Sequence, residues 1–425
     1  MQKIFILLIV LLVFCRCSDH DRPAEKEITP QNTEQKRPDS VSSPKVSRQP
    51  APDPAVARKK FHQHHKKQQK SVREDSIPSH IRDSVRLVKI SWLRENGIQI
   101  DMNEPGSKRF IFNGINDITD HPFSIVSREK FLKINFDNDI LDNTDHFYTN
   151  GMRLDLVTSS MAALPFRYLM LPYHGHGINY YGIALLQNMY TPSTTKVGGI
   201  LQGDRPYAAY LCFSYYKITN DPRKMKRQTS DFYLGVIGPS SGGDFVQTQF
   251  HKSVPTNNEP LGWQYQIQND LVLDYSLNFE KGLVSSPRLE LNITGGGELG
   301  TLYTHLHGGF LLRTGLMNPY FSNLWVLPAD INRKMGFYNT QVFFFLKANA
   351  QAVGYDATLQ GGMFNHSSVY TKPADQISRF MFNGSAGLTV SHGGMRLDIE
   401  QFLLSPEFQK GWWHKWVHIG LTFCL

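Results

Sequence analysis

Short segments of alternating apolar and polar residues are the feature that most constrains this chain. Beyond residue 130 the sequence divides into segments of roughly ten residues, alternating or rich in aromatics, separated by Gly, Pro, Asn and Asp. Strands that bury one face show this two-residue period, and long stretches with the helical period of 3.6 are absent. The pattern predicts twelve strands, at 130–137, 149–158, 180–190, 206–218, 230–238, 265–280, 286–297, 304–314, 339–352, 376–391, 394–403 and 414–424.

The last of these segments is typical of a sheet that closes on itself. Residues 416–425 alternate cleanly up to the end of the chain. A closed barrel leaves no strand edge unpaired in lipid, and bacterial single-chain barrels have an even number of strands. A mean hydropathy of -0.34 excludes a polytopic helical membrane protein but not a barrel. We therefore predict an all-β fold, a transmembrane antiparallel β-barrel of twelve strands, with a soluble β-sandwich or β-propeller as the alternative that strand counting leaves open.

The first 123 residues have a different character. Lys3 and the apolar run 4–14 that follows it are typical of a signal peptide, because the run is too short to span a bilayer. Cys15 and Cys17 stand where bacterial lipoproteins are acylated, but no small residue precedes either one, so lipidation stays open. The sequence predicts a signal peptide at 1–17, a disordered basic and polar tail at 18–123 with one amphipathic helix at 79–95, and an outer-membrane barrel domain at 124–425.

The net charge of +8 is concentrated in part of the tail. Residues 58–70 carry six Lys or Arg side chains and three His side chains, with no acidic residue among them. A solvated flexible tether is the ordinary interpretation of such a cluster, and contact with anionic lipid headgroups is the alternative. Because the charge is local to the tail, we expect no nucleic-acid partner for the barrel.

Polar residues that a plain strand does not need collect in four segments. They are 135–139 at the end of the first strand, 148–151 at the start of the second, 190–208 after the third and 238–270 after the fifth. Loops after odd-numbered strands of an antiparallel barrel lie at one rim, which is the outer rim if the first strand rises from the periplasm. We therefore expect Asn138, Asp139, Thr149, Lys196 and His251 at the same edge of the barrel.

Each of these segments also has an ordinary explanation. Asp-Asn-Asp beside a turn is more often turn chemistry than a metal site, and a single loop histidine is usually just exposed. Lys196 and Arg205 are the kind of residues that form plain surface charge, and Gly242-Gly243 is typical of a flexible turn. Their common place at one rim is what favours a shared site.

The motifs also occur in a specific order and spacing. They are Ile134 to Asp139, Thr144-Asp145, Tyr148 to Gly151, Tyr190 to Pro192, Asp204 to Ala208, Gly235 to Pro239, Gly242-Gly243, Val246-Gln247, His251, Trp263 and Gln266. This ordered set resembles the lipid A 3'-O-deacylase family over roughly residues 124–425. The resemblance implies a monomeric, twelve-stranded outer-membrane barrel that removes the 3'-linked acyloxyacyl group of lipid A, with Ca²⁺ at its active site.

The resemblance also assigns roles to single residues. It makes Asn138, Thr149, Lys196 and His251 catalytic, and makes Asn138, Asp139, Thr149 and Glu259 calcium ligands. His251 stands at the family's essential His and Lys196 at its loop Lys. The family has an acidic residue shortly after this His, and Asn257 or Asn258 stands at that position in this chain. Glu259 is near enough in sequence to substitute for it.

The chemistry of these residues suits ester hydrolysis. A histidine with a pKa near neutral can deprotonate water, while a cation and Lys196 face the developing oxyanion. Ca²⁺ accepts many oxygen ligands in loose geometry, which suits a site where substrate phosphates and protein carboxylates meet. The acyl chains of lipid A can then stay in the bilayer against the outer wall while the sugar reaches the rim.

Two other functions remain open at this stage. An outer-membrane phospholipase is also a barrel esterase, but it needs a His and Ser pair facing lipid. Ser391 and His392 are adjacent in sequence, so they lie on opposite faces of a strand and cannot form that pair directly. The second alternative is a catalytically silent barrel that acts as a porin or a surface scaffold.

Overall fold

The computed structural model describes residues 98–100, 110–112, 125–139, 146–175, 177–253 and 259–425. The signal peptide, the basic cluster and the expected helix at 79–95 lie outside these residues. Within the segment expected to be disordered, β1 (Ile98–Ile100) pairs with β2 (Phe110–Phe112) in antiparallel register.

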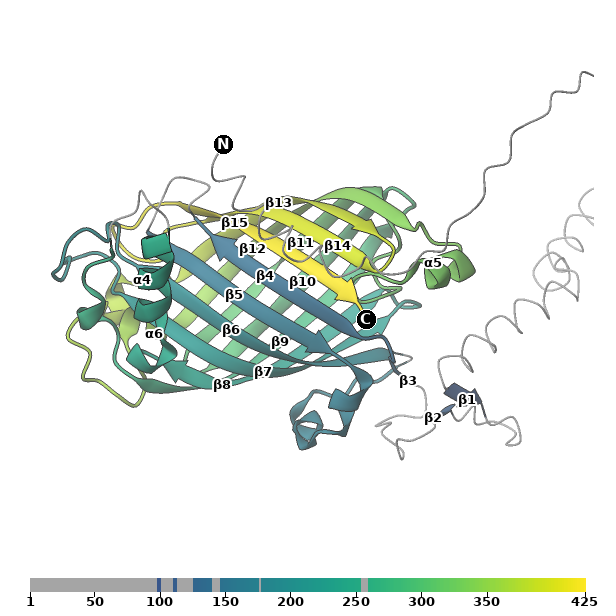
Figure 1. Ribbon diagram of the computed structural model, residues 1–425, viewed down its shortest axis with the longest axis horizontal. Helices are drawn as coiled ribbons and strands as arrows, with labels where there is room; N and C mark the ends of the chain where they lie inside the picture. The colour runs from purple at the N-terminus through teal and green to yellow at the C-terminus, as the bar shows by residue number, and fades with distance from the viewer. Residues whose placement is uncertain (1–97, 101–109, 113–124, 140–145, 176, 254–258) are drawn as a thin grey trace, which may run out of the picture. The chain divides into compact units, whose positions relative to one another are not determined.

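Twelve antiparallel strands form a closed barrel (Figure 1). They are β4 (Phe131–Asn138), β5 (Phe147–Val157), β6 (Ile178–Thr191), β7 (Ala208–Asp221), β8 (Lys226–Ile237), β9 (Asp270–Ser285), β10 (Leu289–Gly300), β11 (Tyr303–Leu316), β12 (Thr340–Asp356), β13 (Phe380–His392), β14 (Met395–Leu404) and β15 (His414–Cys424). Each pairs with its neighbours in sequence, and β15 pairs with β4 from Val417–Asn138 to Cys424–Phe131. The short β3 (Ile125–Val126) adds a parallel pairing to β6. The predicted twelve-stranded barrel and its closing strand are confirmed.

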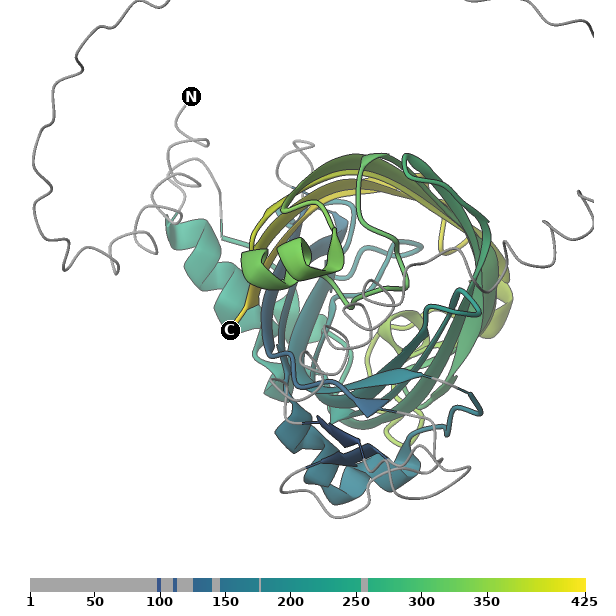
Figure 2. The same cartoon turned by 90° about the vertical axis from the view of Figure 1, so that its right-hand side faces the viewer.

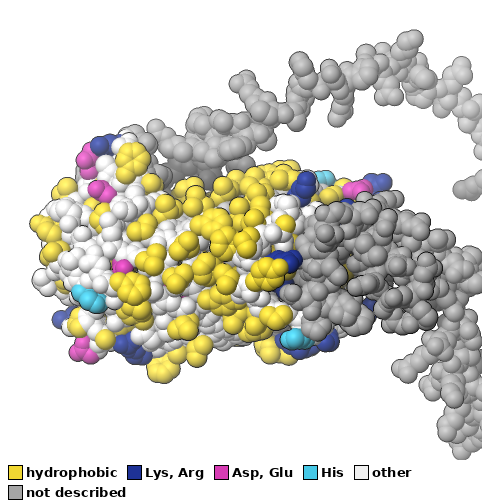
Figure 3. Space-filling model, turned by 90° about the horizontal axis from the view of Figure 1, so that it is seen from below, with side chains coloured by type: hydrophobic (Ala, Val, Ile, Leu, Met, Phe, Trp, Pro, Cys, Tyr) yellow, Lys and Arg dark blue, Asp and Glu magenta, His cyan; other side chains and the backbone are white. Residues whose placement is uncertain are grey.

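Side chains alternate between lipid and lumen along the strands. On β5, Met152 and Leu154 are about half exposed on the outside, while Arg153 and Asp155 form an ion pair on the inside. Figure 3 shows apolar side chains spread over the middle of the outer wall. The inward residues are largely polar and line cavities of about 390 and 450 Å³. This is the alternation expected of a barrel in a bilayer. Among the helices that the structure describes, none is both long and apolar enough to cross a membrane.

The connections divide between two rims (Figure 1). The α4 rim carries η5 (Pro239–Ser241), α4 (Gly243–Ser253), η6 (Trp263–Tyr265), α6 (Ala357–Gln360) and η7 (Ala374–Gln376). The α5 rim carries η3 (Ser159–Ala163), η4 (Pro165–Leu169), α5 (Ala329–Met335) and the C-terminal residue. Consecutive strands are antiparallel, so alternate loops lie at the same rim. The loops that follow the first, third and fifth strands of the barrel, β4, β6 and β8, therefore all lie at the α4 rim, as do those after β10, β12 and β14.

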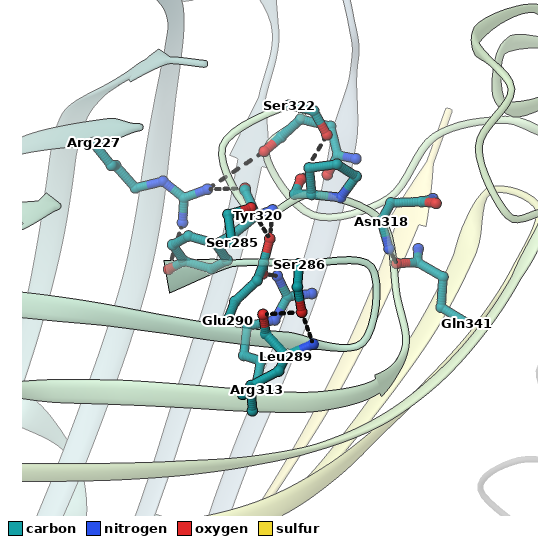
Figure 4. Close-up of polar contacts among 12 residues, drawn as sticks. Arg227, Ser285, Ser286, Leu289, Glu290, Arg313, Asn318, Tyr320, Ser322 and Gln341 are labelled. Carbon is teal, nitrogen blue, oxygen red and sulfur yellow. Dashed lines mark hydrogen bonds and ion pairs between the residues drawn. The ribbon is translucent and has the colours of Figure 1, made fainter. Parts of the chain in front are cut away.

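The long connection between β11 and β12 folds into the lumen. Residues 317–327 form this plug, and its hydrogen bonds reach Arg227 on β8 and Glu290 on β10 (Figure 4). A further hydrogen bond joins it to Asn220 on β7. The plug also bonds to β12 and β14. One short segment can reach so many strands only from inside the ring. Leu324 and Val326 pack there against inward aromatic residues of β4, β6 and β7. The connection is longer than a turn requires because part of it is buried in the lumen.

Some strand limits differ from the prediction near the α4 rim. The strand expected at 265–280 spans Asp270–Ser285, because Gly262 adopts a φ of 113° and starts a 3-10 turn at 263–265. Likewise the strand expected from 376 begins at Phe380, after the 3-10 turn Ala374–Gln376. The residues of the Trp263–Tyr265 turn alternate between aromatic and polar side chains, as the residues of a strand do.

Candidate active site on the outer wall

Asn138, Asp139 and Thr149 meet where β4 and β5 reach the α4 rim. The Asn138 side-chain amide donates to the Thr149 carbonyl oxygen at 3.3 Å. An Asp139 carboxylate oxygen accepts from the backbone N–H of His146 at 3.0 Å. All three candidate residues are buried, with Asp139 only 1% exposed. A carboxylate held this far from bulk water is not ordinary turn chemistry at a loop tip.

A bulge on β5 sets the direction of Thr149. Tyr148 pairs with Tyr190 and Asn150 with Met189, so Thr149 is the extra residue between them. Bulges re-aim side chains in this way. The Thr149 hydroxyl lies 2.7 Å from the Thr191 hydroxyl at the end of β6. Thr191 shares its strand face with the exposed, lipid-facing Leu185, so this hydroxyl pair lies on the outside of the barrel.

The helix α4 lies against the outer wall at the same end of β6. A Cβ on Gly243 would lie 2.3 Å from the Ala209 Cβ and 3.3 Å from Met189, so the helix start touches β6 and β7 directly. Met189 and Ala209 are on the same faces of their strands as the exposed Leu185 and Phe213. Figure 2 shows α4, coloured for residues near 250, outside the ring of strands.

His251 belongs to the stripe of α4 that faces this wall. Gly243, Gln247 and His251 are spaced by four residues, so they lie on one side of the helix. All three are buried, whereas Asp244 and Phe245 are exposed. The Gln247 side-chain oxygen accepts from the Trp263 indole N–H at 2.7 Å, which fixes the middle of the stripe. His251, 4% exposed in the last turn, therefore points toward the barrel wall rather than into solvent.

Two loops bring Lys196 to the segment that follows α4. The backbone N–H of Leu261 donates to the Thr195 carbonyl at 2.7 Å, one residue from Lys196. The Tyr207 hydroxyl donates to the Leu261 carbonyl at 2.5 Å and joins the loops again. Lys196 itself is exposed. Glu259 is exposed in the same region and forms an ion pair with Lys252 at 3.3 Å.

The oxygen-rich set at 138–149 fits the chemistry of a calcium ion. It combines a buried carboxylate, a side-chain amide and a hydroxyl, which are hard oxygen donors. Within the described part of the chain, no group of three or more His, Cys, Asp or Glu residues has the arrangement of a metal site. A calcium site here would therefore depend on Asn and Thr oxygens beside the single carboxylate, and substrate and water oxygens would have to complete the six to eight ligands that the ion takes.

Comparison with known proteins agrees with this architecture. The family model described as "Outer membrane protein LpxR" matches residues 118–424. This chain belongs to the LpxR outer membrane protein family. Among solved structures, it is similar to LpxR from Salmonella typhimurium, with a TM-score of 0.54 and 18% identity over 69% of this chain and 100% of that one. It also matches the β domain of the Bordetella autotransporter Brka, with a TM-score of 0.38 and 9% identity over 70% of this chain and 100% of that one. No curated protein sequence matches.

Membership of the LpxR family places this protein in the bacterial outer membrane. The predicted barrel, family and location are thereby confirmed. In this LpxR-family barrel the apolar outer wall is the face turned to lipid, and α4 and the Thr149–Thr191 pair lie on that outer side, at the α4 rim.

Arg205 has a role that the sequence did not indicate. It is 1% exposed rather than a plain surface charge, and its guanidinium binds the Glu407 carboxylate and the Thr358 hydroxyl. It also lies 4.2 Å from the Tyr190 ring. In this LpxR-family protein Arg205 thus connects the loops before β7, after β12 and before β15. Burial raises the pKa of Glu407, and the adjacent Arg205 opposes that shift.

Ser391 and His392 lie far from this site. They end β13 at the α5 rim, where the buried Ser391 accepts from Gln341 and the exposed His392 contacts Thr340. Their opposite orientation confirms that they form no His–Ser pair.

Proposed function

We propose that this LpxR-family protein is a calcium-dependent carboxylic ester hydrolase that removes the 3'-linked acyloxyacyl group of lipid A. The resemblance in sequence and the family membership support the substrate class. The proposal depends on one geometric observation. The face of α4 that includes His251 packs on the outer side of β6, at the α4-rim end of that strand, where the Thr149 and Thr191 hydroxyls meet. A lipid substrate can reach this face from the bilayer.

The position of the site suits a lipid with a large polar headgroup. The acyl chains would lie against exposed apolar residues of β5, β6 and β7, such as Met152, Leu185 and Phe213. The glucosamine and phosphate groups would lie at the α4 rim, among polar loops. This arrangement requires the α4 rim to face the outside of the cell, in the leaflet that carries lipopolysaccharide.

His251 would accept a proton from the attacking water and return it to the leaving alkoxide. Lys196 would stabilise the negative charge on the ester oxygen, with its flexible stem reaching from the exposed loop. The hydrogen bond from Asn138 to the Thr149 carbonyl would hold the oxygen-rich set in place. When bound by Asn138, Asp139 and Thr149, calcium would supply Lewis-acid polarisation of the ester and a counter-charge for substrate phosphates.

Glu259 remains a candidate calcium ligand. Its carboxylate is already engaged by Lys252 at 3.3 Å, so it would have to exchange this partner for the ion. An exposed ion pair is weak, typically below about 1 kcal/mol, so the exchange costs little.

The alternative of a porin is disfavoured by the plug. Residues 317–327 occupy the lumen at one rim, and Arg205 joins three loops at the other. A catalytically silent scaffold would have the same fold, so a measurement of activity distinguishes it from an enzyme.

Purified protein in detergent with lipid A tests the proposal. We expect release of one acyloxyacyl chain, abolished by a calcium chelator and restored by calcium, with a loss of about 100-fold or more for His251→Ala. Asp139→Asn should raise the calcium concentration needed for half-maximal rate. If the chelator did not change the rate of acyl release, calcium would have no part in the mechanism. If the His251→Ala protein were fully active, His251 would not be the general base.

A further inference from the structure

A cluster of cations lies on the α5 rim, far from the proposed active site. It consists of Arg223, Lys224, Lys226, Lys281 and Arg288, from the β7–β8 turn, the facing ends of β8 and β9, and the β9–β10 turn. All except the half-buried Lys281 are exposed. We call these five residues the basic rim patch.

Within the patch two lysines face each other. Lys226 on β8 and Lys281 on β9 are direct cross-strand partners. Their neighbours Arg227 and Glu280 point into the lumen, where they form an ion pair at 3.9 Å, so both lysines point outward. Like charges in this position repel. Lys281 donates to the Lys224 carbonyl, which draws its ammonium group toward the turn and concentrates the charge there.

The two carboxylates beside this patch, those of Asp221 and Glu280, form no ion pair with its side chains. Asp221 is buried and accepts from the Tyr173 hydroxyl at 2.8 Å and the Lys224 backbone N–H at 3.0 Å. Glu280 faces the lumen. Among the ion pairs of the described residues, none includes a member of the basic rim patch. The cations thus present their charge outward.

The surface around the patch is apolar and continues the lipid-facing wall. Leu283, Val284 and Leu289 are 43–54% exposed on the hairpin that carries Lys281 and Arg288. Beside it, the arm formed by η3 and η4 lies on the outer wall, where the Tyr275 hydroxyl donates to the Leu169 carbonyl at 2.8 Å. Tyr168 on this arm is 74% exposed. Exposed aromatic and aliphatic residues interleaved with Lys and Arg are typical of the bilayer interface, where cations reach the headgroups.

We propose that the basic rim patch binds the phosphate of anionic phospholipid headgroups. A phosphate between Lys226 and Lys281 would relieve their mutual repulsion and accept hydrogen bonds from both ammonium groups. Arg223 and Arg288, on neighbouring turns, can each donate two N–H groups to phosphate oxygens. With the α4 rim facing outward, this patch meets the phospholipid leaflet of the outer membrane. The assignment of the ligand class does not depend on the deacylase activity.

Spin-labelled lipids measure this selectivity directly. The full chain is reconstituted in phosphatidylcholine vesicles, and electron paramagnetic resonance compares the restricted fractions of labelled phosphatidylglycerol and labelled phosphatidylcholine. Each cation near a membrane contributes about five-fold to anionic lipid binding. We therefore expect the preference for phosphatidylglycerol to fall by up to about 25-fold in Lys224→Gln/Lys226→Gln, which removes two cations. Lys410→Gln/Lys415→Gln removes two exposed cations from the α4 rim and should keep the wild-type preference.

Salt provides a second readout that needs no variant. The preference should nearly vanish in about 1 M NaCl, where the Debye length is about 3 Å. A wild-type protein with equal restriction of the two lipids would overturn the proposal, as would a patch variant that keeps the full preference. Equal loss in the α4-rim variant would show that net charge, rather than this patch, selects the lipid.

Discussion

Replacing Gly243 by alanine tests whether the docking of α4 positions His251. The added Cβ would lie 2.3 Å from the Ala209 Cβ, and 3.2 Å from the Trp263 ring. Carbon atoms prefer a separation of about 3.5–4.0 Å, so the helix start must move outward by about 1.2–1.7 Å. A displacement of about 1 Å at a catalytic group can cost about 100-fold in rate. We therefore expect Gly243→Ala to reduce deacylation by about 100-fold.

The same change does not lower the helix propensity of this segment, because alanine is a better helix former than glycine. Any loss of activity would therefore come from the steric overlap with the barrel wall. Lipid A hydrolysis is measured by mass spectrometry, and the barrel is checked by the different gel mobility of unheated and heated protein. Gly199→Ala is the matched control on the same rim, since nothing lies within 4 Å of its added Cβ.

A second substitution sharpens this test. Ala209→Gly removes the atom that Gly243→Ala would strike, so the double variant should recover most of the lost activity. Full activity of Gly243→Ala alone would refute the reasoning, because the helix could then move without consequence for the chemistry. A single variant that is inactive and not rescued would show that Gly243 acts by another route.

Three further predictions concern the hydroxyl pair, the loop ion pair and pH. Thr191→Val should lower the rate about ten-fold and raise the half-saturating calcium concentration, because Thr149 loses its hydroxyl partner; calcium titration of the activity checks this. Arg205→Gln should lower the free energy of unfolding by about 3 kcal/mol, measured by urea titration in vesicles, because Glu407 is left without its cation; an unchanged midpoint would contradict this. Burial raises the pKa of Glu129 from 4.5 to about 7, so the folded protein holds this proton more tightly and stability falls as the pH rises between these values; Glu129→Gln should remove that fall in urea titrations across the range.

The barrel could be predicted from the sequence because its strands obey a simple rule. Side chains such as Met152 and Leu154 face lipid and alternate with the inward Arg153 and Asp155, so the period of two is visible without any tertiary information. Strand parity then placed Asn138, Thr149 and His251 at one rim, as observed. Whether these residues act as proposed remains a prediction.

The helix that carries His251 could not be predicted from its own residues. It is only eleven residues long, and its buried stripe is a glycine, a glutamine and a histidine. Such a stripe shows no apolar period. It packs closely on the wall because Gly243 has no side chain, and Gln247 is held there by a hydrogen bond from Trp263. The sequence did contain one indication of a helix: Asp244 stands in its first turn and Lys252 in its last, where each charge interacts favourably with the helix dipole.

The plug and Arg205 depended on contacts between distant parts of the chain. The inward path of the connection between β11 and β12 is set by partners on β7, β8 and β10. In the sequence Arg205 could not be distinguished from a surface arginine, because its ion-pair partner Glu407 is 202 positions away. Tertiary partners of this kind leave no local pattern.

The most direct measurement of the central claim is the mass of lipid A from bacteria that express this protein. Cells with the wild-type chain should yield lipid A lighter by one 3'-linked acyloxyacyl group, and cells with the His251→Ala protein at equal abundance should yield the unmodified form. Identical lipid A from both strains, or equal modification by the His251→Ala protein, would contradict an active site formed by α4 on the outer wall.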